Sequence, residues 1–279
     1  TMEDKMKVHI SDAVADTLFI PLFMKCRETQ RKDTIIKDPL ACEMISKLDY
    51  DFSRYGKSIM SFTGVAIRAR HFDNQVREFI NREEYPIVVL IGCGLDTRFH
   101  RLKDVSKKAT FYELDLPEVI ALRETLLPPS ANDICLPHSM FETEWMDALK
   151  QKYPDASFAF IIEGVLMYFD EKDVRKVFLN LAEHFPGSEI HFDVINRWMS
   201  RHSHIHDTVK FTNATFKFGC DDDRMFEKWN SRLKHRSTRL YTDVKEWKRA
   251  GIQGLLMKII PSFKYSGRML CYEIMDPVQ

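Results

Sequence analysis

The stretch from Ile87 to Arg98, IVVLIGCGLDTR, constrains the fold of this chain more than any other. It opens with five consecutive large apolar residues, four of them β-branched, a run typical of a strand buried on both faces of a parallel sheet. The run ends at Gly92-Cys93-Gly94, and a helical pattern follows Thr97. A strand that turns into a helix on glycines exposes backbone N–H groups and the positive end of a helix dipole. The stretch therefore predicts a cradle for a nucleotide or nucleoside.

The spacing of the glycines leaves two ligands open. A dinucleotide fingerprint has a third glycine three residues after the second, where this chain has Thr97. Thr97 weakens the interpretation that the turn binds the pyrophosphate of a dinucleotide, but does not exclude it. S-adenosylmethionine has no phosphate and needs only a close backbone approach at Gly92 or Gly94. Two glycines alone do not decide between these ligands, because a strand can also end on glycines simply to turn.

From residue 86 onwards, strand patterns alternate with helical ones, which favours βαβ units and an α/β fold with a mostly parallel sheet. We expect strands over the following ranges: 87–91, 110–115, 134–137, 157–162, 189–195, 255–260 and 269–274. Residues 1–84 are mostly helical. Ser11 or Asp12 caps a helix with a kink or break at Pro21, Asp38-Pro39 begins a second helix, and a third covers Ser58 to Arg82.

We expect a single domain over residues 1–279. It divides into a helical N-terminal part (1–84), a cofactor-binding core (86–195), a lid insertion without an obvious strand–helix unit (196–240), and a C-terminal helix, expected at Asp243 to Ala250, with strands (241–279). Asp221, Asp222 and Asp223 are expected to start a helix in the lid. Its alternating His202, His204 and His206 lack a nearby cysteine or acid cluster, so a surface role is preferred and no metal site is predicted.

Composition excludes several classes of protein. Lys plus Arg and Asp plus Glu balance at 41 each, so we expect neither a nucleic-acid nor a membrane partner. The six cysteines are scattered without paired spacing, which favours reduced thiols over a disulfide framework or a zinc site. The longest apolar run, Leu18 to Met24, is too short to span a bilayer, and no signal peptide is evident. A cytoplasmic location is expected.

Two carboxylates are placed where an open α/β sheet binds ligands. Asp115 ends the second core strand, 21 residues beyond Gly94, where an acid accepts hydrogen bonds from ribose hydroxyls. Glu113 points to the same side of that strand, but Asp115 is preferred because it lies at the strand end. Glu163 follows the strand 157–162 and faces the same crevice, where an unpaired carboxylate is costly.

In combination, these motifs resemble the leucine carboxyl methyltransferase family of S-adenosylmethionine-dependent O-methyltransferases, in particular its tetracenomycin-type, small-molecule branch. The matching segments are RARHFD at 68–73, GCGLDTR at 92–98, ELDLPEV at 113–119, EGVLMY at 163–168 and FGCDD at 218–222. The resemblance covers residue 11 to the C-terminus. It implies a Rossmann-like class I methyltransferase fold with a seven-stranded sheet and helices on both faces.

The resemblance also implies roles for individual residues. Arg68 would contact the carboxylate of the cofactor's methionine end, although spacing alone favours a solvated helix face for this arginine. Gly92 would be the close-approach glycine, Asp115 the ribose acceptor and Glu163 the partner of the cofactor's amino group. Ser139 and Met140 occupy the position near the adenine, where the family usually has Asp and an apolar residue. Lys25 is a loose counterpart of a cofactor-contacting lysine in the phosphatase branch.

The implied activity is methyl transfer from S-adenosylmethionine to a carboxylate or hydroxyl of a small molecule. A carboxylate acceptor needs no general base, because it is ionised at neutral pH. A hydroxyl needs one, for which the lid histidines and Tyr168 are weak candidates, and no catalytic base is named. The alternatives are a protein C-terminal carboxyl methyltransferase, an NAD(P)-dependent oxidoreductase and a non-catalytic cofactor-binding protein. Neither the acceptor nor the oligomeric state follows from the sequence.

Overall fold

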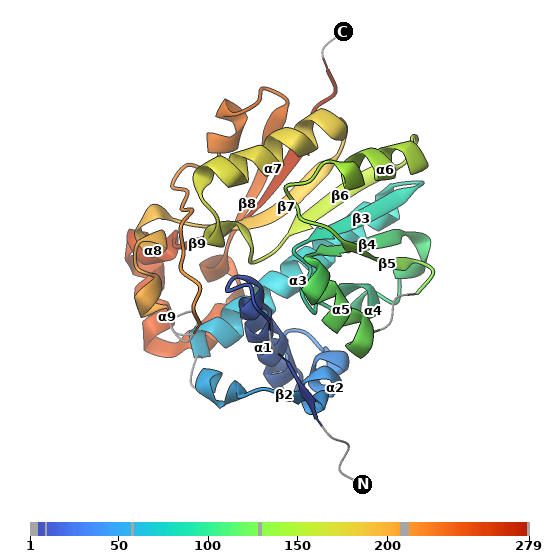
Figure 1. Cartoon of the computed structure of the whole chain (residues 1–279). Coiled ribbons are helices and arrows are strands. Elements are labelled where there is room, and N and C mark those ends of the chain that lie inside the picture. Colours follow the sequence, from blue (N-terminus) through green and yellow to red (C-terminus); the bar gives the residue numbers. More distant parts are fainter. Residues whose placement is uncertain (1–4, 9, 57–58, 128–129, 207–211, 278–279) are drawn as a thin grey trace.

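A seven-stranded sheet forms the centre of the computed structural model, which describes residues 5–8, 10–56, 59–127, 130–206 and 212–277 (Figure 1). The strand order is β5-β4-β3-β6-β7-β9-β8. The first five strands pair in parallel, β9 is antiparallel to β7, and β8 is antiparallel to β9. The predicted α/β fold is therefore confirmed. The strands are β3 (Pro86–Ile91), β4 (Thr110–Asp115), β5 (Asp133–Pro137), β6 (Ser157–Ile162), β7 (Glu189–Ile195), β8 (Leu233–Leu240) and β9 (Gly267–Ile274).

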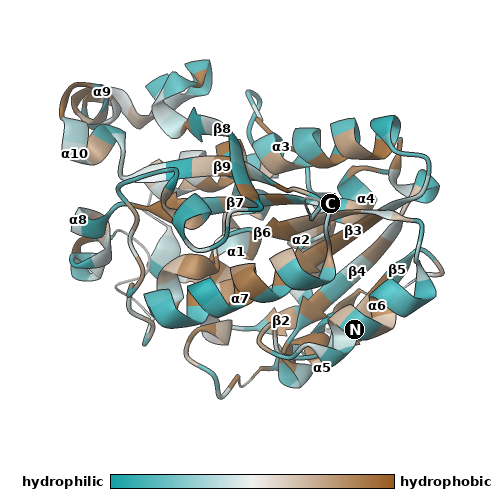
Figure 2. Cartoon of the chain, turned by 90° about the horizontal axis from the view of Figure 1, so that it is seen from above, coloured by the Kyte–Doolittle hydropathy of each residue, from teal (hydrophilic) through white to brown (hydrophobic). Residues whose placement is uncertain are grey.

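Helices cover both faces of the sheet, and Figure 2 shows the apolar strands between them. α6 (Glu144–Lys152) and α7 (Glu171–His184) pack on the face that carries Val89. α3 (Ile59–Arg82) and the 3₁₀ helix Lys245–Ala250 cover the face that carries Val88. Because both faces are buried, the central strands read as continuous apolar runs. The other helices that follow β3 are α4 (Arg98–Arg101), α5 (Pro117–Leu126), α8 (Arg197–Ser200), α9 (Gly251–Ile259) and α10 (Pro261–Lys264).

The N-terminal part is mainly helical, as predicted. Asp12 Oδ1 accepts hydrogen bonds from the backbone of Val14 and Ala15, before the 3₁₀ helix Ala15–Leu18 and α1 (Phe19–Thr29). Pro21 lies in the first turn of α1, where its missing N–H needs no partner. The expected kink or break corresponds to the change from the 3₁₀ helix to α1 at Phe19. α2 (Pro39–Lys47) has Asp38 as its N-cap, as predicted. β1 (Met6–Lys7) pairs in parallel with β2 (Leu48–Asp49).

The prediction that the cysteines are reduced thiols is wrong for one pair. Cys26 in α1 and Cys42 in α2 form a disulfide, with their Cα atoms 4.7 Å apart. Their separation of 16 residues carries no signal in the sequence, because two antiparallel helices bring them together only after folding. Cys93, Cys135, Cys220 and Cys271 are free thiols.

Four local predictions in the C-terminal third differ from the structure. Residues 255–260, expected as a strand, lie mostly in α9. The range 196–240, in which no strand–helix unit was obvious, contains β8, a polar edge strand in which only Leu233 is buried. The expected helix at Asp243 to Ala250 is the 3₁₀ helix Lys245–Ala250, and the acids at 221–223 precede only a short 3₁₀ helix, Met225–Lys228. Asp221 and Asp223 instead bind Arg197 N and Arg268 Nε.

The strand order reverses between β3 and β6. In an open α/β sheet, the crevice outside the carboxyl ends of the strands at such a reversal is where ligands bind. A cavity of about 700 Å³ opens there, lined by the ends of β3, β4, β6 and β7 and by the N-terminal helical part. No helix in the described ranges is both long and apolar enough to cross a membrane.

Candidate functional site: a cofactor cavity at the carboxyl ends of the strands

The turn after β3 requires glycine on steric grounds. Gly92 has φ 71° and Gly94 has φ 51°, both in the left-handed region that L residues with a side chain rarely adopt. A Cβ on Gly92 would lie 2.6 Å from Val165 Cγ2. Gly92 N donates to Leu114 O at 2.8 Å, which ties the turn to β4. The glycines therefore allow the backbone to line the cavity without side chains in the way.

Asp115 holds this turn in place from the end of β4. Its Oδ2 accepts a hydrogen bond from Gly94 N and its Oδ1 accepts one from Leu116 N, both at 2.8 Å. Burial raises the pKa of Asp115, although the two backbone donors oppose the shift. The side chain lines the cavity. Glu113, the alternative considered, is fully buried 3.1 Å from Arg123 Nη2 and does not line the cavity.

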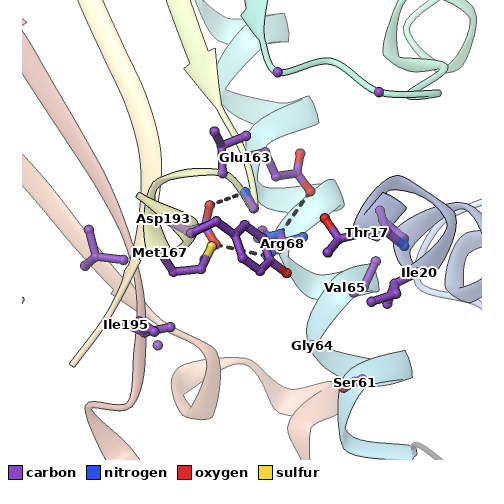
Figure 3. Close-up of a pocket in the computed structure, with 18 of the residues that line it drawn as sticks. Thr17, Ile20, Ser61, Gly64, Val65, Arg68, Glu163, Met167, Asp193 and Ile195 are labelled. Atoms are coloured by element: carbon purple, nitrogen blue, oxygen red, sulfur yellow. Dashed lines mark hydrogen bonds and ion pairs between the residues drawn. The ribbon is translucent and has the colours of Figure 1, made fainter. Parts of the chain in front are cut away.

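Arg68 and Glu163 lie next to one another in the lining of the cavity (Figure 3). Arg68, on α3, donates from Nε to Glu163 Oε1 at 3.1 Å. Its Nη1 donates to Asp193 Oδ2 at 3.0 Å. Arg68 therefore faces the site rather than solvent, contrary to what spacing alone favours. Asp193, near the end of β7, also accepts from Gly164 N at 2.6 Å, so it fixes both the arginine and the turn after Glu163.

Glu163 is held ionised by two guanidinium groups. Arg98 Nη2 lies 2.5 Å from Glu163 Oε2, and Arg68 binds the other oxygen. Burial by itself would raise the pKa of Glu163, but Arg98 and Arg68 outweigh it and lower the pKa below its usual value. Asp193 has the opposite balance, and burial raises its pKa despite Arg68. The cavity thus presents a charged carboxylate beside a charged guanidinium.

A buried ion network supports this pair from behind. Arg98 is 1% exposed and also binds Asp73 Oδ1 at 2.8 Å and Asp96 Oδ2 at 2.9 Å. Asp96 Oδ1 accepts from Lys25 Nζ at 2.7 Å. Lys25 belongs to α1, so the network connects the N-terminal helical part to the turn after β3. Removing one member of such a network leaves buried charges without partners, which is strongly destabilising.

Ser139 and Met140 lie on the side of the cavity next to Asp115. They follow β5, and both line the cavity. Ser139 Oγ accepts a hydrogen bond from Phe141 N at 3.2 Å, and Met140 is buried. The structure therefore brings all seven predicted site residues to one cavity: Arg68, Gly92, Gly94, Asp115, Ser139, Met140 and Glu163. Lys25 joins them.

A second part of the same cavity is largely apolar. Its lining comes from α1, α3, the turn after β6, the segment 212–220 and the region of α9 and α10: Ile20, Val65, Met167, Phe216, Leu256, Met257 and Phe263. Tyr168 and Tyr241 also line it. Burial raises the pKa of Tyr168 to about 12 and that of Tyr241 well above its usual value, so both phenols are neutral at physiological pH.

The three alternating histidines divide between two places: the rings of His202 and His204 lie 5.8 Å apart, whereas His206 packs against Phe216. His202 stacks on Trp198 with ring centroids 4.5 Å apart, and its Nδ1 lies 2.6 Å from Trp198 O. Of the three, His206 lines the cavity. Across the described ranges no group of His, Cys, Asp and Glu side chains is arranged to hold a metal ion.

Sequence reasoning missed Asp193 and Arg98. Asp193 lies inside the apolar strand pattern EIHFDVI, where an acid near the carboxyl end of a parallel strand is the same signal that identified Glu163. Arg98 ends the GCGLDTR segment, and a cation inside the predicted ligand turn is the signal that could have identified it. Neither residue was assigned a role.

Comparison with known proteins agrees with this geometry. The family model for leucine carboxyl methyltransferase matches residues 19–182, more than half of the chain. The tetracenomycin polyketide synthesis O-methyltransferase TcmP of Streptomyces glaucescens is 26% identical over 93% of this chain and 96% of its own. An S-adenosyl-L-methionine-dependent methyltransferase of Gibberella zeae, dpfgK, is 25% identical over 95% of each chain.

Solved structures agree on the fold. A DUF574 family protein from Streptomyces avermitilis superposes with a TM-score of 0.56 at 11% identity, over 94% of this chain and 99% of its own. A SAM-dependent methyltransferase from Anabaena variabilis gives a TM-score of 0.51 at 10% identity, over 98% and 99%. The expected class I methyltransferase fold is confirmed. With a matching family model and these full-length relatives, the chain belongs to the leucine carboxyl methyltransferase family of S-adenosylmethionine-dependent methyltransferases.

Proposed function

We propose that this methyltransferase transfers the methyl group of S-adenosylmethionine to an oxygen of a small molecule, preferentially a carboxylate. The observation that carries the proposal is the division of one cavity into a charged part at the strand ends and an apolar part beside it. The cofactor occupies the charged part and the body of the acceptor occupies the apolar part.

The residues of the charged part fit the cofactor. The bare backbone at Gly92, where a Cβ would clash with Val165, leaves room for close approach of the ligand. Arg68 and Glu163, an opposite-charge pair, match the carboxylate and ammonium of a zwitterionic amino acid. Asp115 presents a carboxylate at the end of β4 for ribose hydroxyls. Ser139 and Met140 would flank the adenine.

The chemistry requires alignment more than acid–base catalysis. The bound cofactor supplies an electrophilic methyl group on a sulfonium, and displacement is in line. The protein's part is to orient the two reactants and to exclude water, which the apolar lining does. Tyr168 and Tyr241 are neutral and so are poor bases. Apart from Tyr168, His206 is the base candidate from the sequence that lines the cavity. We favour an acceptor that needs no base because it is already ionised, a carboxylate, over a hydroxyl.

The relatives support a small-molecule acceptor rather than a protein terminus. The Streptomyces glaucescens relative is an O-methyltransferase of polyketide synthesis. The segment 196–240, which we propose as a lid, contributes Met199, Ile205, His206 and Phe216 to the cavity lining. Such a lid limits the size of the acceptor molecule that can enter the cavity.

A radiolabelled methyl-transfer screen over apolar carboxylic acids and phenols tests the proposal. We expect methylated product from carboxylic acids, and release of the label by mild base identifies an ester. Label that resists base would assign a hydroxyl acceptor instead. Stabilisation by NAD or NADP, but not by S-adenosylhomocysteine, would overturn the cofactor assignment.

Calorimetry of one variant tests the residue roles. Asp115→Ala is expected to weaken S-adenosylhomocysteine binding about tenfold or more, because hydrogen bonds to a charged group contribute about 1.5–3 kcal/mol. Asp104→Ala is the matched control, since that acid is exposed and lies outside the cavity lining. Equal affinity of the two variants would remove Asp115 from the binding site.

A further inference from the structure

The exposed apolar side chains of the molecule gather on one short region. Six of the nine large apolar residues that are exposed in the described ranges lie between residues 252 and 265. Ile252 is 80% exposed, Ile259 68% and Leu255 58%. We call the six together the α9 patch: Ile252, Leu255, Leu256, Ile259, Ile260 and Tyr265. Figure 2 shows α9 as a brown helix at the periphery, away from the sheet. Contiguous exposed apolar surface of this kind marks an interaction site.

The patch follows helical periodicity, and α9 is firmly seated. Residues 252, 255, 256 and 259 recur at the spacing of a single helix face. Gly254 lies on the opposite side of α9, where it is buried and has no side chain to hold the helix away from its neighbours. A Cβ there would lie 2.5 Å from Ala250 Cβ, and Trp247 Nε1 donates to Gly254 O at 3.2 Å. The apolar face therefore points outward because the other face is fixed against the 3₁₀ helix Lys245–Ala250.

The segment that carries the patch is basic in sequence. No Asp or Glu occurs from Trp247 to Tyr272, although the whole chain is balanced. Lys248 and Lys258 are exposed and Lys264 is half-buried. Within the described residues, no ion pair is formed by any of these three lysines, whereas Arg249 and Arg268 in the same segment pair with Glu28 and Asp223. Lys258 of α9 and Lys264 of α10 therefore add positive charge next to the apolar face, and Lys264 Nζ lies 5.5 Å from the centre of the Tyr265 ring.

The patch also borders the cavity. Leu256 and Ile260 belong to the patch and line the cavity, together with Phe263 and Lys264 of α10. Ile252, Leu255 and Ile259 do not line it. The α9 patch therefore extends from the solvent-exposed side of α9 to the apolar part of the cavity.

We infer that the α9 patch docks on an anionic lipid surface. Exposed aliphatic side chains bury into the acyl boundary while flanking lysines bind lipid phosphate and carboxylate groups. The charge argues against a second copy of this chain as the occupant, because a two-fold dimer through the patch would bring its unpaired lysines together. In the described ranges no helix can cross a membrane, so the proposed contact is one of surface binding. The inference does not depend on the proposed function.

The test is flotation of the full chain with large unilamellar vesicles. We expect binding to vesicles of phosphatidylcholine with phosphatidylserine, weak binding to phosphatidylcholine alone, and a loss of binding at high salt. Ile252→Gln combined with Ile259→Gln is expected to reduce partitioning by more than about tenfold, since each lost aliphatic anchor removes much apolar burial. Lys258→Gln is expected to reduce only the anionic component.

The matched control is Tyr85→Gln combined with Met275→Gln, two exposed apolar residues outside the patch, which should float like the wild type. Thermal stabilisation by S-adenosylhomocysteine shows that each variant is folded. Absence of wild-type binding to anionic vesicles, or equal binding of the patch variant, would overturn the inference. A wild-type dimer that the patch variant dissociates, without vesicle binding, would instead assign the patch to a second copy.

Discussion

At the scale of single residues, the turn after β3 depends on the absence of one methyl group. Gly92 combines a positive φ with a side-chain neighbour, Val165, that leaves no room for a Cβ. We predict that Gly92→Ala destabilises the protein by about 1–3 kcal/mol through backbone strain and abolishes S-adenosylhomocysteine binding. Urea unfolding measures the first effect and calorimetry the second.

The control is the same substitution in α3. A Cβ on Gly64 meets nothing within 4 Å, and the residue is helical, so Gly64→Ala should stabilise by roughly 0.5–1 kcal/mol. Adding Val165→Ala to Gly92→Ala removes the clash but keeps the strain, so only part of the stability should return. Complete recovery in the double variant would show that φ at Gly92 costs nothing.

At the scale of elements, the sequence predicts buried structure well and surface structure poorly. β3, β4, β6 and β7 were predictable because burial on both faces demands uninterrupted apolar runs. The same rule misassigned residues 255–260, whose apolar run serves an exposed helix face. β8 was missed because an edge strand with one covered face can be built from polar residues. The site residues that were found follow strands; Arg98 and Asp193 needed the three-dimensional ion network.

The N-cap of α2 is an element-scale feature with a testable cost. Asp38 Oδ1 accepts from Ala41 N at 3.1 Å, and the buried carboxylate also lies 3.3 Å from Arg101 Nη1. We predict that Asp38→Ala lowers the free energy of unfolding by about 1–2 kcal/mol or more through the lost cap. Asp38→Asn should recover only the part of the unfolding free energy that comes from the cap, because asparagine can accept the Ala41 N–H bond but carries no charge to pair with Arg101. Asp170→Ala removes an N-cap aspartate whose side chain makes no capping bond to α7, so urea unfolding should detect little change. Equal losses at Asp38 and Asp170 would contradict this account of the cap.

At the scale of the whole molecule, the site joins parts of the chain that are distant in sequence. Lys25 of α1, Arg68 of α3, Asp96 after β3 and Glu163 after β6 are linked through one set of ion pairs around the cavity. The parallel strands β3 and β6 bring two of these segments to one edge of the sheet, and α3 and α1 supply the other two. Ligand binding should therefore stabilise the N-terminal helical part as well as the core.

Hydrogen exchange with and without saturating S-adenosylhomocysteine tests this coupling. At a ligand concentration 100-fold above Kd, mass action stabilises the native state by about 2.7 kcal/mol, and the effect slows exchange only where local opening would release the ligand. We predict slower exchange at residues 92–98, 163–168 and 15–25. α7 packs on the face of the sheet away from α3 and provides the internal control. Amides of α7 that exchange through local fraying should exchange at the same rate with and without the ligand. Protection limited to 92–98 would mean that the N-terminal part opens independently of the bound ligand, and that the Lys25–Asp96 pair does not couple the two.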